Sequence, residues 1–409
     1  MLILHTSDWH LGRNLYGRRR QHEFAAFLDW LLDTISANKV DVLLVAGDVF
    51  DTTTPGNRAQ ELYYRFLCRV AQSCCRHVVI VAGNHDSPSF LAAPRELLSV
   101  LNVHVVAAVT EDGTDEVLLL RDEHGEAELI VAAVPYLRDS DIRQVQAGES
   151  IADKERNLAA AVIDHYAAVA AQAEALRAEV GADVPLIGTG HLFAIGGTAG
   201  RDDGMRELYV GSLGHIDVAL LPDCFAYLAL GHLHSAQTVA GDATRRYSGA
   251  PLAMGFGDAG QEKSVTLVEM TAGEITVSSI AVPVFQALER ISGDMDSILA
   301  RIGQLVAADA SIWLEVVYSG DAIVGDIRAR LDKAVAASAV EILRVKNERV
   351  VAQALRQMDE AEVLDDLSVD EVFKRCLDAH QVPKAQREQL LAAFGEAVTA
   401  VQEEDRQAQ

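Results

Sequence analysis

Residues 5–12 read HTSDWHLG and follow a short apolar run at 1–4. The run is typical of the start of a buried strand, yet Asp8 and His10 come almost directly after it. Side chains two positions apart project to the same side of an extended backbone. A carboxylate and an imidazole held in this way are costly to bury, and useful when a cation lies between them. Alone, the pattern more often marks an ordinary polar turn, so the remainder of the chain has to decide between the two interpretations.

The composition indicates a globular protein of two or three domains. Its 409 residues are 50% hydrophobic and 23% charged, which is enough apolar material for more than one core. The chain contains no stretch of about 18 uncharged apolar residues, and its apolar start lacks the basic segment of a signal peptide. The five cysteines form no C-x-x-C pair. We therefore expect a cytoplasmic protein without a membrane span.

Residues 1–282 alternate short apolar runs with helical stretches. The expected strands are 1–6, 41–47, 77–83, 103–109, 128–136, 185–191 and 227–232, and the expected helices are 21–37, 59–72 and 152–180. This alternation predicts an α/β domain with helices packed against a central sheet. A hairpin is expected at its end, from 264–270 and 274–282.

The pattern changes near Pro283, where a small second domain begins. Residues 283–347 are expected to form strand, helix, strand, helix and strand. Residues 348–409 begin as an acidic linker and then form two amphipathic helices, the first of which opens with a capping box from Ser368 to Glu371. The apolar faces of these helices either pack on the chain's own second domain or require a partner surface.

Four further apolar runs end at glycine and are followed by residues that bind metals. These residues are Asp48, Asp51, Asn84, His85, Asp86, His191, His232 and His234. In open α/β sheets ligands bind at the carboxyl ends of the strands, so we expect all five motifs to converge on one edge. Each motif alone is consistent with a turn or a hydrogen-bonded histidine, but the five together favour a metal site.

The mixture of side chains narrows the kind of metal site. Imidazoles together with oxygen ligands suit manganese, iron or zinc, and the absence of cysteine from the set disfavours a closed structural zinc site. Even seven of these side chains acting as ligands would exceed what one ion needs when positions are left open for water. Two ions that share a bridging carboxylate fit better, and such a pair can activate water and stabilise the displacement of a phosphoryl oxygen.

The motifs resemble those of the calcineurin-like metallophosphoesterase superfamily. More closely, HTSDWHLG, VAGDVFDT, AGNHDS, TGHL and ALGHLH are similar to the SbcD family, the nuclease subunits of bacterial SbcCD complexes. The resemblance implies a layered metallophosphoesterase sandwich at 1–282, a small α/β capping domain at 283–347, and a linker and C-terminal helices at 348–409 that bind the ATPase partner.

The resemblance also implies roles for individual residues. Two Mn²⁺ ions would be held by Asp8, His10 and His234 on one side, by Asn84, His191 and His232 on the other, and by Asp48 as the bridge. His85 would contact the scissile phosphate and assist the leaving oxygen, with Asp86 orienting its ring. Archaeal and eukaryotic relatives tend to carry histidine at the position of Asp51, so the role of Asp51 stays open.

The function implied by this resemblance is that of a manganese-dependent DNA nuclease in repair, recombination and replication. It would act as a double-strand exonuclease and as an endonuclease on hairpins and single strands. The C-terminal helices would bind an SbcC-type coiled-coil ATPase of the ABC/SMC kind, which would use the ATP because this chain has no G-x-x-x-x-G-K-[ST] loop. Helices near 58–73 and 88–101 would form a homodimer within a heterotetramer.

The same metal centre can hydrolyse other phosphoesters. Phosphoprotein phosphatases typically carry arginine soon after their GD motif and GNHE in place of GNHD, whereas residues 49–54 contain no arginine and residue 86 is aspartate. A small-molecule or cyclic-nucleotide phosphodiesterase remains the alternative, although it would not need the second domain and terminal helices.

The net charge of −25 argues against a protein that coats nucleic acid by electrostatic attraction alone. A nuclease with this charge needs metal ions, a local basic patch or a basic partner. The stretch GRNLYGRRRQHEF at 12–24 supplies such a patch beside the first motif, with Arg13, Tyr16, Arg18, Arg19 and Arg20 as candidate DNA-binding residues. The alternative is that these side chains are a solvated approach to a helix.

Overall fold

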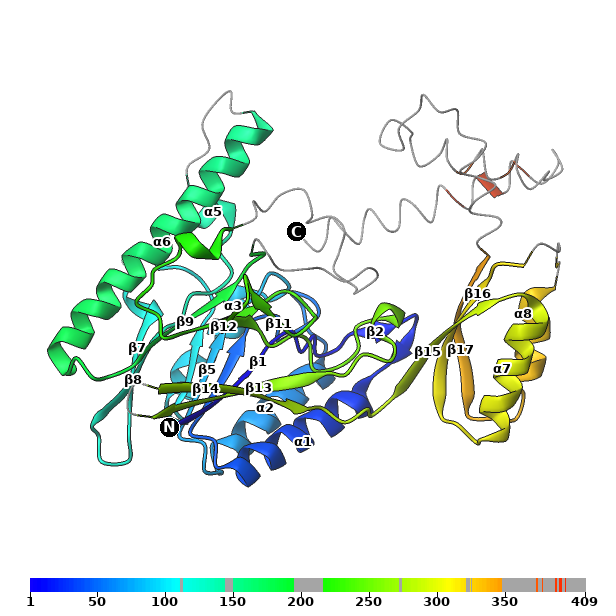
Figure 1. Cartoon of the computed structure of the whole chain (residues 1–409), viewed down its shortest axis with the longest axis horizontal. Coiled ribbons are helices and arrows are strands. Elements are labelled where there is room, and N and C mark those ends of the chain that lie inside the picture. Colours follow the sequence, from blue (N-terminus) through cyan, green and yellow to red (C-terminus); the bar gives the residue numbers. More distant parts are fainter. Residues whose placement is uncertain are drawn as a thin grey trace. The chain divides into compact units, whose positions relative to one another are not determined.

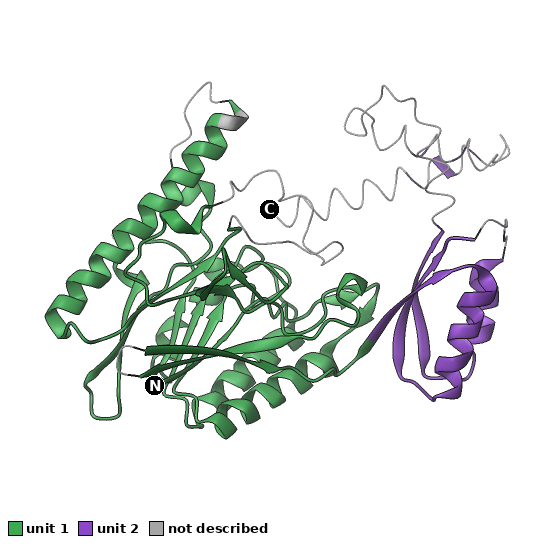
Figure 2. Cartoon of the chain, in the orientation of Figure 1, with its two compact units in different colours: residues 1–287 green, residues 288–409 purple. Residues whose placement is uncertain are grey.

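Two compact units make up the chain in the computed structural model, Met1–Ala287 and Leu288–Gln409 (Figure 2). The described residues are 1–110, 113–143, 150–194, 216–271, 274–320, 324, 326–347, and Phe373, Leu377, Arg387, Leu390, Leu391 and Phe394. The division falls at the start of β15 (Ala287–Gly293), a few residues after the boundary expected from the sequence. Within these described residues, no helix has the length and hydropathy needed to cross a membrane.

The first unit contains a six-stranded sheet built around the N-terminal strand. Its order is β14 (Glu274–Ala281), β13 (Ser264–Thr271), β1 (Leu2–Thr6), β4 (Val42–Ala46), β5 (His77–Val81) and β6 (Val103–Val106). Strands β1, β4, β5 and β6 run parallel, so their carboxyl ends lie at one edge. Strand β13 is antiparallel to β1 and to β14, which confirms the predicted hairpin.

A second six-stranded sheet follows in the chain. Its order is β11 (Gln237–Val239), β12 (Asp242–Tyr247), β10 (Tyr227–Gly231), β9 (Leu186–His191), β8 (Ala127–Ala132) and β7 (Val117–Arg121). The four inner strands are parallel, and the two edge strands β7 and β11 are antiparallel to their neighbours.

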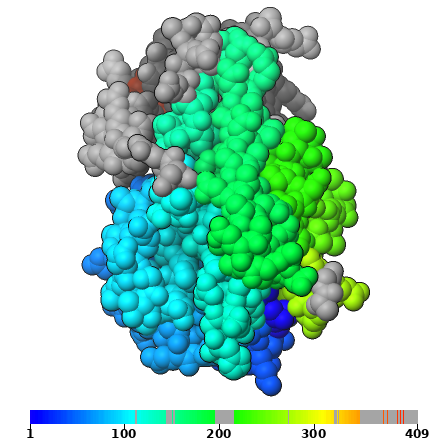
Figure 3. Space-filling model, turned by 90° about the vertical axis from the view of Figure 1, so that its left-hand side faces the viewer, coloured from blue at the N-terminus to red at the C-terminus, as the bar shows by residue number. Residues whose placement is uncertain are grey.

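Helices cover the outer faces of both sheets, and the inner faces pack against each other (Figure 1). Alternate residues of one strand therefore serve different layers, since Leu43 packs toward the helices and Leu44 toward the second sheet. The helices over the first sheet are α1 (Gln21–Asn38) and α2 (Asn57–Val70). Helix α6 (Ile151–Val180) covers the second sheet as a continuous ridge (Figure 3).

The unit is a four-layer α/β/β/α sandwich, in keeping with the layered sandwich that the resemblance implied, whereas the one central sheet expected from the alternation of strands and helices is two sheets. Every residue of β4 and β5 is buried, as it would be in either arrangement. A strand covered by helices on both faces and a strand covered by a helix and a second sheet give the same apolar run. The strands and long helices themselves lie where the sequence predicts them.

Short elements connect the main ones. They are β2 (Asn14–Leu15), β3 (Arg18–Arg19), α3 (Pro88–Ala92), α4 (Arg95–Ser99), η1 (Thr114–Glu116), α5 (Asp139–Ile142), η3 (Val218–Leu220) and η4 (Phe256–Asp258). Strands β2 and β3 form a tight antiparallel hairpin directly after the first motif.

The second unit has the predicted order of strand, helix, strand, helix and strand. Its elements are β15, α7 (Met295–Ala307), β16 (Ile312–Tyr318), α8 (Ile327–Ala334) and β17 (Val340–Asn347). The sheet order is β15-β16-β17, and Asp294 caps α7 by accepting the N–H of Ser297 at 2.8 Å. The two predicted C-terminal helices lie outside the described residues, apart from isolated positions such as Phe373 and Phe394, whose rings stack with centroids 3.9 Å apart.

Glycines allow the two sheets to meet at their carboxyl edges. A Cβ atom placed on Gly231, at the end of β10, would lie 1.8 Å from the carbonyl oxygen of Ala46 in β4. Within the first sheet, a Cβ atom on Gly83, after β5, would lie 2.1 Å from the carboxylate of Asp48, after β4. No real Cβ atom tolerates such distances, so only glycine permits this approach.

We expect Gly231→Ala to lower the free energy of unfolding by about 3 kcal/mol, because the added methyl group pushes β10 away from β4. The matched control is Gly303→Ala in α7, where a Cβ atom meets nothing within 4 Å. That change should stabilise the chain by about 0.5–1 kcal/mol, as alanine does inside a helix. Denaturant unfolding of both variants measures the difference, and equal effects would contradict this account of the sheet contact.

Candidate metal centre

The predicted ligands lie together where the carboxyl edges of the two sheets converge. Asp8 and His10 follow β1, Asp48 follows β4, and Asn84 follows β5 in the first sheet. In the second sheet His191 is the last residue of β9, while His232 and His234 follow β10. The motifs therefore converge as expected, but the edge on which they meet is formed by two sheets together.

A hydrogen bond between the sheets sets the orientation of His191. Its Nδ1 lies 3.0 Å from the carbonyl oxygen of Ala46 in β4, so Nδ1 carries the hydrogen and donates. Nε2 then faces the other candidate ligands, and a metal-binding histidine is usually fixed by such a second bond.

Four of the ligands occupy a backbone conformation that side chains rarely adopt. The φ angles are 53° at Asp8, 47° at His10, 50° at Asp48 and 104° at His232. Such residues carry strain of roughly 1–3 kcal/mol each and cluster at functional sites. Backbone bonds hold two of them, from the N–H of Asp8 to Gly47 and from the N–H of His10 to Asp48, both at 3.0 Å.

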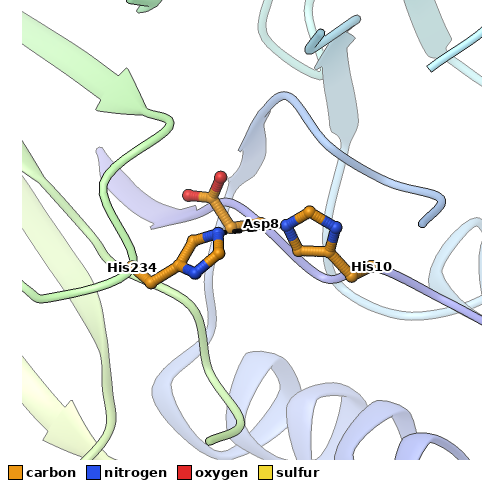
Figure 4. A group of neighbouring side chains, drawn as sticks. All are labelled: Asp8, His10 and His234. Carbon is orange, nitrogen blue, oxygen red and sulfur yellow. Dashed lines mark hydrogen bonds between the residues drawn. The ribbon is translucent and has the colours of Figure 1, made fainter. Parts of the chain in front are cut away.

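Asp8, His10 and His234 form the first group of candidate ligands (Figure 4). The Nε2 atoms of His10 and His234 are 3.1 Å apart, and the ligand atoms of all three residues lie within 4.8 Å of one another. Ligands bound to one ion at about 2.1 Å lie roughly 3 Å apart when the bonds are at right angles. The spacing therefore fits a divalent cation between the three side chains.

Asn84, His191 and His232 form the second group. The amide oxygen of Asn84 lies 2.9 Å from Nε2 of His191 and 3.2 Å from Nδ1 of His232. Asp48 lies between the groups, since its Oδ2 is 3.3 Å from Nε2 of His191 and 3.6 Å from Nε2 of His10. One carboxylate within reach of both groups is what a pair of ions with a bridging ligand requires.

Burial sets the protonation of the ligands in the protein without a cation. It lowers the pKa of His10, and that of His232 to about 3, so both rings are neutral. Burial raises the pKa of Asp8 to about 7. Burial would also raise the pKa of Asp48, but its electrostatic interactions with the imidazoles of His191 and His85 hold it well below its usual range. Burial would lower the pKa of His191, but the carboxylate of Asp48 raises it to about 9.

His85 lies beside the ligands with its ring held by the backbone. Its Nδ1 is 2.8 Å from the carbonyl oxygen of Asp51, and its ring meets that of His10 edge to face at 4.8 Å. Its backbone N–H donates to Oδ1 of Asp48 at 2.8 Å. The Nε2 atom is therefore the nitrogen of His85 that can exchange a proton with a substrate.

Asp86 does not contact the ring of His85, contrary to the orienting role expected for it. Its buried carboxylate accepts the backbone N–H groups of Gly83 at 2.9 Å, Val49 at 3.1 Å and Phe50 at 2.9 Å. Burial raises its pKa to about 6. Asp86 thus ties the loop after β4 to the loop after β5, and the Asp51 carbonyl holds His85.

Asp51 supports the first group from behind, a role that the sequence left open. Its Oδ1 lies 3.4 Å from Nδ1 of His10 and accepts a bond from Arg13 at 3.1 Å. Burial would raise the pKa of Asp51, but its interactions with the side chains of His10 and Arg13 lower it to about 2. A carboxylate on the far nitrogen of a ligating histidine fixes the ring and increases its basicity.

Two residues of the site were missed in the sequence. Arg138 donates to the carbonyl oxygen of Asp86 at 3.1 Å, and its guanidinium lies 5.9 Å from the ring centroid of Tyr136. The edge of Tyr136 in turn meets the ring of His191 at 6.2 Å. Both residues follow β8, so the rule that found the other ligands could have found them, but the predicted strand was extended to residue 136.

The basic stretch after the first motif lies beside the centre, but only some of its side chains are exposed to solvent. Arg18 and Arg19 are exposed on β3, and Tyr16 is 46% exposed and stacks on Phe256. Arg20 is buried and bonds both oxygens of Glu23 at 2.7 and 2.8 Å, so its charge is balanced.

Comparisons with known proteins agree with this geometry. Residues 1–147 match the family described as calcineurin-like phosphoesterase, and residues 284–381 match the type 5 capsule protein repressor C-terminal domain. The chain is 37% identical over 397 residues to SbcD of Escherichia coli (strain K12), the D component of nuclease SbcCD, and the match covers 96% of this chain and 97% of that protein.

Two further relatives are the same component of nuclease SbcCD in other bacteria. The Rhodobacter capsulatus protein is 33% identical over 353 residues, 82% of this chain and 85% of that protein. The Bacillus subtilis (strain 168) protein is 36% identical over 276 residues, 67% of each chain. These matches confirm the resemblance that the strand-end motifs indicated.

We expect the affinity for divalent cations to rise with pH between about 6 and 9, because protons on Asp8 and His191 compete with the metal. The pKa values of about 7 and about 9 place both competing protons in this interval. Titration calorimetry in buffers of different ionisation enthalpy counts the protons released. Their number should fall toward zero above pH of about 9, and an affinity independent of pH would rule out these ligands.

We expect Asp86→Asn to lower the free energy of unfolding by about 2–3 kcal/mol, because an amide cannot accept all three buried N–H groups. The control is Asp122→Asn at the surface, where the carboxylate accepts N–H groups of His124 and Glu126 at 2.9 Å each and water can replace it. Denaturant unfolding compares the two variants. Equal losses of unfolding free energy in the two variants would show that burying the carboxylate of Asp86 does not increase its contribution to stability.

Proposed function

The chain belongs to the SbcD family of metal-dependent phosphoesterases, the nuclease components of SbcCD, and we propose that it cleaves DNA phosphodiester bonds with two manganese ions. One observation carries this proposal. Oδ2 of Asp48 lies 3.3 Å from Nε2 of His191 in one group and 3.6 Å from Nε2 of His10 in the other. Asp8, His10 and His234 would hold one ion, Asn84, His191 and His232 the other, with Asp48 shared.

Manganese is proposed because the ligand set mixes carboxylate and amide oxygens with imidazoles and includes no thiolate, which suits this ion better than magnesium or calcium. Bound cations of this kind supply an activated water and neutralise charge on the phosphoryl oxygens. The neutral rings of His10 and His232 leave the positive charge of the ions undiminished, which favours an anionic substrate.

His85 is proposed to give a proton to the leaving oxygen. The carbonyl of Asp51 fixes Nδ1–H of His85, so Nε2 is the atom from which the proton passes. Asp86 is proposed to act indirectly, because its hydrogen bonds hold together the backbone of the loops that carry Asp48 and His85. Arg138 and Tyr136 brace the same loop against His191.

DNA is proposed as the substrate, and Arg13, Tyr16, Arg18, Arg19 and Arg20 as residues near its path. The exposed guanidinium groups of Arg18 and Arg19 offer positive charge on a chain whose net charge is −25. The buried pair of Arg20 with Glu23 reduces what Arg20 can add to long-range attraction. The proposed substrates are double-strand ends, hairpins and single strands, in repair, recombination and replication.

The proposed partners are an SbcC-type coiled-coil ATPase and a second copy of this chain. The relatives are named as components of SbcCD, and the C-terminal helices proposed to bind the ATPase lie outside the described residues. The proposal of a homodimer is supported by Leu97 and Val100 near α4, which are 71% and 79% exposed. Among the described cysteines Cys68, Cys74, Cys75 and Cys224 are free thiols, in keeping with a proposed cytoplasmic location.

We expect His85→Ala to slow Mn²⁺-dependent cutting of a labelled hairpin DNA by about 10²–10⁴-fold, because the leaving oxygen loses its proton donor. Metal-stripped protein is assayed with Mn²⁺ or Mg²⁺ added, beside bis-p-nitrophenyl phosphate as a small diester. The control is His124→Ala, since His124 is a surface residue. Metal content measured on both variants should equal that of the wild type.

Three outcomes of this assay have distinct meanings. Loss of DNA cutting with the metal retained supports both the nuclease and the role of His85. Cutting by His85→Ala at the wild-type rate overturns the role of His85. Hydrolysis of the small diester without any DNA cutting, even after the coiled-coil ATPase is added, overturns DNA as the substrate.

A further inference from the structure

A pocket of about 300 Å³ lies between the β2–β3 hairpin, the start of α1 and the start of α2. It is as large as the smaller pockets that hold ligands in proteins. Its lining residues are Gly12, Arg13, Asn14, Arg19, Arg20, Gln21, Phe24, Gly56, Asn57, Arg58, Ala59 and Leu62. Arg58 comes from α2, far along the chain from the basic stretch, and no motif of the sequence pointed to it.

The lining contains four arginines and no carboxylate. Three of these arginines have acidic partners that are not part of the lining, namely Arg13 with Asp51, Arg20 with Glu23 and Arg58 with Glu61. Arg19 forms no ion pair with any residue that the structure describes. The positive charge that is not balanced by a carboxylate in this hollow is therefore that of Arg19, while the paired guanidinium groups can still offer N–H donors to an anion.

Arg20 supplies a second and independent indication of a ligand. It is only 3% exposed, and its Nη1 has no hydrogen-bond partner among the described residues, although Nε and Nη2 both bond Glu23. Buried donors of a charged group are rarely left without an acceptor. A ligand with several acceptor oxygens in the pocket would provide one.

The beginning of α2 points to the same ligand chemistry. The helix starts at Asn57 after Gly56, with no side-chain cap and no acidic residue in its first turn. The first N–H groups of a helix and its dipole favour an anion at this end. Planar guanidinium groups with helix N–H groups are the usual combination around phosphate.

Arg13 connects the pocket to the metal centre. It lines the pocket and donates to Asp51, whose Oδ1 lies 3.4 Å from the ring of His10. The pocket therefore lies one side chain behind the first group of ligands.

We propose that this pocket binds a backbone phosphate of the strand being cut, next to the phosphate at the metal centre. The inference rests on the proposed function and adds a specificity device to it. A substrate with two or more linked phosphates fills both sites, whereas a diester with a single phosphate fills only one. Free phosphate has the same chemistry, but the shared Arg13 favours a strand that reaches the metals.

The direct test measures binding of a fluorescein-labelled single-stranded oligonucleotide by anisotropy, with chelator present so that the metals do not contribute. Arg19→Ala/Arg58→Ala is compared with Arg156→Ala, an exposed arginine near the start of α6 that pairs with Asp153 three residues away, as Arg58 pairs with Glu61. We expect about tenfold weaker binding by the double variant and a salt dependence reduced by about one phosphate contact. Binding equal to that of the control overturns the proposal.

A catalytic test separates the pocket from a structural effect. The ratio of kcat/KM for the oligonucleotide to kcat/KM for bis-p-nitrophenyl phosphate should fall about tenfold in the double variant, mainly through KM for the oligonucleotide. An unchanged ratio overturns the proposal. If both kcat/KM values fall equally, the substitutions act on the metal centre itself, and if neither falls, the pocket does not contribute to binding of the oligonucleotide.

Titration with inorganic phosphate distinguishes the two sources of the anion. Tight binding of inorganic phosphate by the wild type, lost in the double variant while oligonucleotide binding is unchanged, assigns the pocket to free phosphate and overturns the strand proposal. If the wild type cuts no DNA even after the coiled-coil ATPase is added, the proposed function fails, and the anisotropy measurement still decides the pocket.

Discussion

The contact between the carboxyl edges of two sheets is the constraint on which the site depends. Ligands from one sheet alone would complete neither group, because His234 joins Asp8 and His10, and Asn84 joins His191 and His232. Gly231 allows β10 to touch β4, and the bond from His191 to Ala46 holds β9 against the same strand. The layered core serves to press these two edges together.

This arrangement of the two edges destabilises the folded chain locally. Ionisable side chains are buried together, and four of the candidate ligands carry positive φ angles. Neither feature stabilises a fold, and both are typical of sites that bind charged ligands. Asp86 and Asp51 offset part of the cost, the first by bonding three backbone N–H groups and the second by supporting His10.

Sequence reasoning could predict which candidate ligands lie together because their signal is local. Each lies within a few residues of an apolar run, and parallel strands bring their carboxyl ends to one edge. The apolar pattern by itself could not reveal the second sheet, since a strand has the same apolar pattern whether a helix or another sheet covers it. Nor could it assign Asp86, whose three bonds depend on how the loops after β4 and β5 fold against each other. Arg58 and Arg138 likewise meet their neighbours only in the folded chain, one beside the hairpin that carries Arg19 and the other across two loops.

The central claim is that the two edges form one centre for two cations with Asp48 between them. Electron paramagnetic resonance of the metal-stripped chain, titrated with Mn²⁺, tests it most directly. The account predicts two ions per chain with the spectrum of an exchange-coupled pair, and loss of that coupling in Asp48→Asn. A single bound ion, or two ions whose spectra are independent in the wild type, would contradict it.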